Sequence, residues 1–273
     1  MVRHFLVCLT LLFVPLPVMA QGMRVSTNVF DLQNPTPTGN QNLVSTSLSL
    51  FHNGRVYDSV DFAEEVVILD PAEKKFTVLN TSRKLKTTLN FEEMRRMLET
   101  RTPAVEKYIQ EVVEKDPVNG QKVSESLRFQ LHPSFERSFD PASGVLTLSS
   151  PSFRYKAETR SWEDASLVEK YLAYADWTCQ LNHLMRPNSM FPEPRMKLNA
   201  ALRELEHRIP VSVELDLTPN DSLRLRAEHR FTEGLEDDDR RRIAHWEELL
   251  NSESIRSLPF RSYQQTVLVT RRK

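Results

Sequence analysis

Residues 23–89 alternate apolar and polar side chains at a period of two. Such alternation is typical of antiparallel strands that bury one face. Turn residues divide the stretch, and the strongest turn signal is Asn53-Gly54, because an Asn-Gly pair between two alternating runs favours a two-residue hairpin loop. We therefore predict an up-and-down meander with strands at residues 25–33, 43–51, 55–60, 65–70, 75–80 and 83–89.

The periodicity changes at residue 90, where apolar residues such as Phe91 and Met94 begin to recur every three or four positions. Asn90 stands at the start of this pattern and is a residue type that caps helix N-termini well. We predict a helix over residues 90–115. Because proline is tolerated only in the first turn of a helix, we expect a kink or a restart at Pro103.

The second half of the chain mixes both periods, so strands and helices are predicted to alternate there. The predicted elements are strands at residues 123–131, 144–149 and 153–159, helices at 164–184 and 195–208, strands at 211–217 and 222–231, a charged helix at 235–250 and a last strand at 263–271. The sequence contains no internal repeat and no Gly- or Ser-rich linker. We therefore predict a single α+β domain in which helices pack on one face of a long antiparallel sheet.

The start of the chain has a different pattern, in which the single basic residue Arg3 precedes a short apolar run. This pattern is typical of a secretory signal peptide, and small or modest side chains precede the expected cut between Ala20 and Gln21. We interpret residues 1–20 as the signal peptide and residues 21–273 as the exported domain. The expected location is the bacterial periplasm or the surrounding medium.

Removal of the signal peptide leaves 253 residues with 35 basic and 37 acidic side chains, a formal charge of −2. This balance argues against nucleic acid or a strongly anionic membrane as a partner. Only Cys179 remains of the two cysteines, so an intramolecular disulfide is excluded, and Gln21 supplies no cysteine for a lipid anchor. We expect a soluble domain with no lipid anchor and no transmembrane segment.

Cys179 and His183 are the sharpest candidates for chemistry, because residues four apart lie on one face of a helix. A thiolate and an imidazole in this arrangement could share a metal or form a nucleophile pair. No second cysteine and no metal-ligand spacing accompanies them, and the alternative is a buried thiol beside a histidine at a helix C-terminus. We interpret His207, His229 and His245 as separate surface or interface residues.

The sequence lacks a nucleophile elbow, a phosphate-binding Gly-rich loop and a dinucleotide fingerprint. The acidic run at residues 236–239 and the basic run at 240–242 fit a solvated helix start better than a calcium or phosphate site. We therefore predict no catalytic residue, no metal and no cofactor, and a protein that is not an enzyme. A hydrolase with an unrecognised site stays as an alternative, which requires a histidine to meet a carboxylate or Cys179 in a cleft.

Residues 53–89 contain a further regularity. The segment NGRVY opens one strand, EVVILD ends in Asp-Pro, and KFTVLN and a short strand precede the helix at residue 90. This order resembles that of LolA-like periplasmic lipoprotein carriers and related bacterial envelope proteins. The resemblance implies a strongly curved antiparallel sheet, an open half-barrel, with several helices on its concave face and an acyl chain or another hydrophobic ligand between the layers. The predicted strands at 211–217, 222–231 and 263–271 fit the closing strands of such a sheet.

Three of the predicted strands keep alternate apolar residues on one side. The resulting candidates for the lining of a hydrophobic-ligand site are Phe76, Val78, Leu146, Leu148, Phe153 and Tyr155. These side chains either line a pocket or close a solid core, which is the usual state of a protein interior. Two hypotheses follow: a protein that binds a lipid or another hydrophobic ligand, and an envelope domain that recognises a protein partner through a sheet edge or helix face.

Overall fold

A computed structural model describes residues 22–34, 42–60, 64–186, 189–217 and 223–270. The predicted signal peptide and its cleavage point at Ala20 and Gln21 lie outside the described residues. Within these ranges, no helix is both long enough and apolar enough to cross a membrane.

The described residues form one α+β unit around a sheet of 12 strands in the order β12-β6-β5-β4-β3-β2-β1-β11-β10-β9-β8-β7. The strands are β1 (Met23–Asp31), β2 (Asn42–His52), β3 (Arg55–Val60), β4 (Glu65–Asp70), β5 (Lys75–Asn80), β6 (Leu85–Asn90), β7 (Glu136–Asp140), β8 (Val145–Ser149), β9 (Arg154–Ser161), β10 (Arg208–Asp216), β11 (Arg224–Glu233) and β12 (Arg256–Ser257). Neighbouring strands are antiparallel, except that β12 pairs with β6 in parallel. The predicted antiparallel sheet is therefore confirmed.

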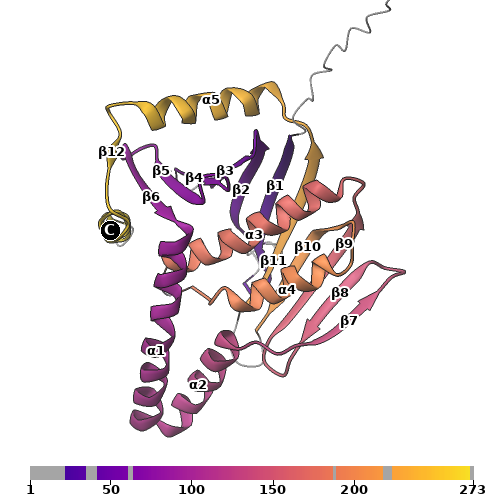
Figure 1. Ribbon diagram of the computed structural model, residues 1–273. Helices are drawn as coiled ribbons and strands as arrows, with labels where there is room; N and C mark the ends of the chain where they lie inside the picture. Colours follow the sequence, from indigo (N-terminus) through magenta and orange to yellow (C-terminus); the bar gives the residue numbers. More distant parts are fainter. Residues whose placement is uncertain (1–21, 35–41, 61–63, 187–188, 218–222, 271–273) are drawn as a thin grey trace, which may run out of the picture.

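The six described helices lie on both faces of this sheet (Figure 1). They are α1 (Phe91–Lys115), α2 (Pro117–Leu131), α3 (Ala165–Met185), α4 (Glu193–Arg203), α5 (Asp237–Asn251) and α6 (Phe260–Thr270). Residues of α1, α3, α4 and α6 join the main core on one face. Ile243 and Trp246 of α5 instead pack with Leu50, Tyr57 and Ile68 in a second core on the opposite face.

The prediction of a strongly curved half-barrel with helices on its concave face alone is wrong. The sheet is not strongly curled or closed, and it ends in two separate edges, β12 and β7. The physical reason lies in strands β2 to β5, whose outward positions also carry large apolar side chains such as Leu50 and Ile68. A second apolar face needs its own cover, and α5 provides it.

The predicted meander is confirmed, and so are its Asn-Gly turn and the helix cap that follows it. Asn53 and Gly54 have φ values of 49° and 78°, which the Asn-Gly hairpin turn requires, since both of its central residues are left-handed. The Asn90 side chain accepts a hydrogen bond from the Glu93 backbone N–H at 2.8 Å and so caps α1 as expected. Helix α1 continues through Pro103 without a restart.

The strand predicted at residues 123–131 is wrong, because this segment belongs to helix α2. Residues 116–119 start this helix, with Pro117 in the first turn and the Asp116 carboxylate accepting the Asn119 backbone N–H at 3.1 Å. Gly120 lets α2 approach α1 closely, since a Cβ at this position would lie 2.3 Å from the Val112 carbonyl oxygen. The pairing of α2 with α1 fixes the helix.

The strand predicted at residues 263–271 is also wrong, because residues 260–270 form helix α6. This segment contains the β-branched residues Thr266, Val267, Val269 and Thr270, and such residues favour a strand locally. The side chains of Phe260, Tyr263 and Val267 are nevertheless all buried in the main core, at the spacing of one helix face. Tertiary packing overrides the local preference here.

Candidate functional site

A cavity of about 520 Å³ lies between helix α3 and the central part of the sheet. Strands β1, β2, β3, β9, β10 and β11 form its floor, and α3 together with the segment leading into α4 covers it. Its volume falls within the range of small-molecule sites, about 300–1,000 Å³. A smaller cavity of about 40 Å³ adjoins it and shares Asp58 and Thr178 with it.

Small polar side chains on β2 create the space below α3. Ser45, Ser47 and Ser49 occupy alternate positions and point to the cavity, while Leu48 and Leu50 contact the second core on the other face. In a strand of this length, inward positions beneath a helix are usually filled by large apolar residues. The serine row leaves that volume empty.

Register partners continue this floor across four strands. Ser47 is opposite Val60 on β3 and Thr27 on β1, and Thr27 is in turn opposite His229 on β11. All four residues line the cavity. The floor therefore contains apolar, hydroxyl and imidazole groups side by side, which suits a ligand of mixed polarity better than a pure hydrocarbon.

One end of the cavity contains a buried carboxyl group, Asp58. The Ser49 hydroxyl donates to the Asp58 carboxylate at 2.8 Å, and it lies 3.2 Å from the Tyr174 hydroxyl. Burial raises the pKa of Asp58 above its usual value, and burial together with the nearby Asp58 carboxylate raises that of Tyr174. The Asp58 carboxyl and the Ser49 and Tyr174 hydroxyls thus form a hydrogen-bonded group on the cavity lining that a ligand hydroxyl can join.

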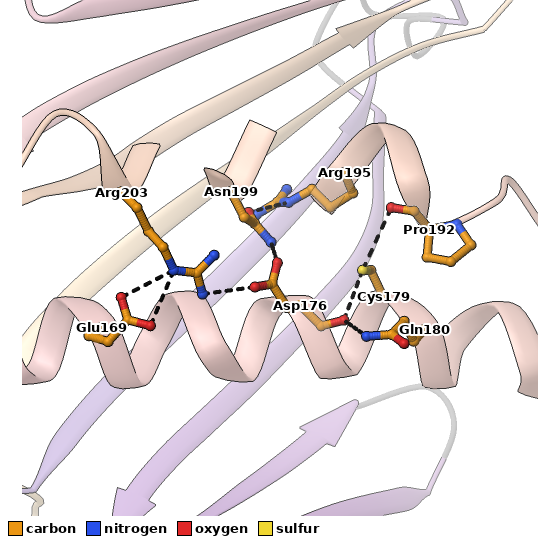
Figure 2. Close-up of polar contacts among 8 residues, drawn as sticks. All are labelled: Glu169, Asp176, Cys179, Gln180, Pro192, Arg195, Asn199 and Arg203. Atoms are coloured by element: carbon orange, nitrogen blue, oxygen red, sulfur yellow. Dashed lines mark hydrogen bonds and ion pairs between the residues drawn. The ribbon is translucent and has the colours of Figure 1, made fainter. Parts of the chain in front are cut away.

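Arg195, in the first turn of α4, brings positive charge to the other side of the cavity. Its Nε donates to Asn199 Oδ1 at 3.1 Å, and Asn199 Nδ2 donates to Asp176 Oδ1 at 2.8 Å (Figure 2). Asp176 also pairs with Arg203 at 2.8 Å, and Arg203 contacts Glu169 at 3.1 Å. This chain of polar contacts between α3 and α4 fixes the orientation of the Arg195 side chain.

His229 lies on the cavity floor as a neutral imidazole. Its Nδ1 is 2.9 Å from Thr27 Oγ1, and its Nε2 is buried and has no hydrogen-bond partner among the described residues. Burial lowers the pKa of His229 to about 3, and the positive charge of Arg195 adds to this shift. Sequence reasoning interpreted His229 as a separate surface or interface residue, whereas the structure places it in the cavity.

The predicted pair Cys179 and His183 also lines the cavity, but the two side chains bind different partners. The Cys179 thiol donates to the Asp176 carbonyl oxygen at 3.1 Å and to that of Pro192 at 3.9 Å (Figure 2). His183 Nδ1 lies 3.2 Å from the Met190 carbonyl oxygen. Burial raises the pKa of Cys179 to about 12, so the thiol stays protonated and is a weak nucleophile.

The described residues contain no group of three or more His, Cys, Asp and Glu side chains arranged to hold a metal ion. Within the same ranges, His207 and His245 are exposed. The acidic residues 237–239 form the first turn of α5, where the Asp239 carboxylate accepts the Glu236 backbone N–H at 3.0 Å. Residues 236–238 are exposed, as expected of a solvated helix start, but the Asp239 carboxylate is 2% exposed and pairs with Arg24 at 3.3 Å.

The six residues predicted to line a hydrophobic site are all buried, but only one of them borders the cavity. All six pack in the main core: Phe76, Val78, Leu146, Leu148, Phe153 and Tyr155. Tyr155 alone of the six lines the cavity. The serine row on β2 is the signal that sequence reasoning missed, since its alternation with leucine is visible in the segment STSLSLF.

Comparison with known proteins adds no relative to this description. The chain matches no protein-family model and no curated protein sequence.

Proposed function

We propose that this protein is a non-catalytic, exported binding protein that holds an amphipathic small molecule, such as a single-chain lipid, in the cavity below α3. The observation that carries the proposal is the cavity itself, about 520 Å³ beneath a helix in an otherwise packed core. Its lining combines apolar side chains with hydroxyl groups, the Asp58 carboxyl group and the guanidinium groups of Arg186 and Arg195.

Packing physics supports a ligand in this space. Protein interiors are close-packed, and a concave space of this volume, mostly apolar with a few polar groups, is typical of small-molecule sites. Here the serine row keeps the volume open where larger side chains would close it. A bound molecule that fills the cavity would restore the lost contacts.

Export and the resemblance to LolA-like carriers support the same proposal. A predicted signal peptide places the protein in the bacterial envelope or outside the cell, where lipids need a carrier to cross water. The carrier role does not require a closed barrel, because the cavity here is formed between one part of an open sheet and α3.

The proposal is tested by filling the cavity with a large side chain. Ser47→Trp places an indole on the floor below α3, whereas Ser166→Trp, in the exposed first turn of α3, adds the same group outside the cavity. Native mass spectrometry of purified protein before and after organic extraction would reveal a co-purifying lipid. Binding of the neutral fluorescent probe N-phenyl-1-naphthylamine would be measured in parallel.

The wild-type protein and Ser166→Trp are expected to bind the probe, and Ser47→Trp is expected to bind it at least about tenfold more weakly. Circular dichroism and thermal unfolding would verify that both variants are folded. Absence of co-purified ligand and of probe binding in the wild type would overturn the proposal and favour an envelope interaction domain. Unchanged probe binding by folded Ser47→Trp would overturn it as well.

A further inference from the structure

Arg195 makes no ion pair within the described part of the chain. Two acidic residues on α3 and α4 already have other cationic partners: Asp176 pairs with Arg203 at 2.8 Å, and Glu193 pairs with Arg101 at 2.6 Å. The charge of a partly buried guanidinium is costly unless an anion compensates it. Arg195 therefore offers an unused charge to the cavity.

Several groups around the cavity sense this charge. It opposes the rise that burial causes in the pKa of Tyr155 on β9 and of Tyr171 and Cys179 on α3. It also helps to lower the pKa of His229 on β11. These groups belong to two strands and one helix and line the cavity together with Arg195, so its charge acts on the cavity lining.

The Arg195 side chain is held in place before any ligand arrives. Asn199, which is fully buried, accepts from Arg195 Nε and donates to Asp176, and Asp176 is itself fixed by Arg203 (Figure 2). A guanidinium has five N–H donors; Arg195 uses Nε for Asn199 and also contacts the Tyr171 hydroxyl, which leaves further terminal N–H groups for a ligand. Carboxylate and phosphate oxygens match that geometry with two parallel hydrogen bonds.

A second, independent observation comes from unpaired polar atoms in the same lining. His229 Nε2 and Ser189 Oγ are both buried and have no hydrogen-bond partner among the described residues. Buried polar atoms without a partner are uncommon in native proteins, so each of them calls for an explanation. A polar ligand group beside Arg195 would give these atoms a hydrogen-bond partner.

We infer that the cavity selects ligands with a compact anionic headgroup, a carboxylate or a phosphate monoester, which binds Arg195 while the apolar part extends below α3. This inference rests on the proposed binding function and names the class of ligand. The neutral hydroxyl groups near Asp58 would contact the remaining polar atoms of the molecule.

The test compares three ligands that share one sixteen-carbon chain and differ in the headgroup: palmitate, hexadecyl phosphate and hexadecanol. Affinities would be measured by displacement of N-phenyl-1-naphthylamine from the wild type and from Arg195→Met, Arg195→Lys and Lys197→Met. Lys197 is exposed on the same helix and makes no contact with the cavity, so its variant is the control for lost positive charge.

For the wild type and Lys197→Met, at least one anionic ligand is expected to bind about tenfold or more tightly than hexadecanol. This difference in affinity corresponds to the free energy of a hydrogen bond to a charged group. Arg195→Met should lose this preference through weaker anion binding, with hexadecanol affinity unchanged, and Arg195→Lys should retain part of it. The ranking of palmitate against hexadecyl phosphate then distinguishes the two headgroups.

Three negative results are possible, and they differ in what they overturn. If the wild type binds hexadecanol as tightly as both anionic ligands, the headgroup inference is overturned and the proposed binding function stands. If none of the three ligands displaces the probe and the probe itself does not bind, the proposed function fails, and the inference fails with it. Retention of the anion preference by folded Arg195→Met also overturns the inference.

Discussion

Replacement of Trp246 by alanine is expected to destabilise the protein strongly, because this residue attaches α5 to the second face of the sheet. Its side chain is 7% exposed and stacks on Tyr57 with ring centroids 6.3 Å apart and an interplanar angle of 21°. Polar contacts flank this stack: the Tyr57 hydroxyl donates to the Glu247 carboxylate at 2.6 Å, and Arg55 contacts the same carboxylate at 3.0 Å.

The magnitude follows from the buried area. A nearly buried aromatic side chain removes about 200 Å² from water, and at about 25 cal/mol per Å² this area corresponds to about 5 kcal/mol. Measured costs of Trp→Ala in protein cores are about 3–5 kcal/mol. We therefore expect Trp246→Ala to lower the free energy of unfolding by about 3–5 kcal/mol.

Urea unfolding followed by circular dichroism would measure the difference. Glu248→Ala is the matched control, since Glu248 is exposed on the same helix and its loss should change stability by less than about 0.5 kcal/mol. A loss below about 1 kcal/mol for Trp246→Ala would refute the reasoning, because α5 would then not cover an apolar face that needs burial.

Two further predictions concern the cavity and the helix pair α1 and α2. The pKa of Asp58 is raised by burial, so over a range of pH the folded protein keeps a proton that the unfolded chain has released. This range lies between the ordinary carboxyl pKa and the higher pKa of the folded state. Within it, the free energy of unfolding falls by about 1.4 kcal/mol for each pH unit. Asp58→Asn lacks this proton, and its stability relative to wild type should increase over the same pH window in urea unfolding; a difference that does not vary with pH would contradict this. Gly120→Ala should destabilise the protein by about 1–3 kcal/mol, because the new Cβ would meet the Val112 carbonyl. Thermal unfolding would measure the loss, and an unchanged midpoint would show that α2 does not approach α1 so closely.

The local elements that the sequence predicts well are those in which periodicity and turn chemistry agree. Strands β2 to β6 follow their alternation, and Asn53-Gly54 sets the first hairpin because both residues accept the left-handed backbone. The residues 123–131 and 263–271 fail for the opposite reason. Their local preference for a strand is weaker than the packing of Gly120 against α1 and of Tyr263 into the main core.

The candidate site shows the same division. Alternation alone places Ser45, Ser47 and Ser49 on one side of a strand, and that much is readable in the sequence. Nothing in the sequence indicates that α3 covers this side, or that His229 lies in register with Thr27, more than 200 residues away in the chain. The role of Arg195 depends on Asn199 and Asp176, which come from two different helices.

The sequence by itself determined the elements whose side-chain period and turn residues agree, because strand alternation and helix caps act over a few residues. It also determined the alternating serines of β2. Only the tertiary structure decided that β1 pairs with β11, that α5 covers a second sheet face and that a cavity forms below α3. The physical reason is that these features depend on burial and charge pairing between segments far apart in the chain, and a local pattern contains no information on which distant surface it will meet.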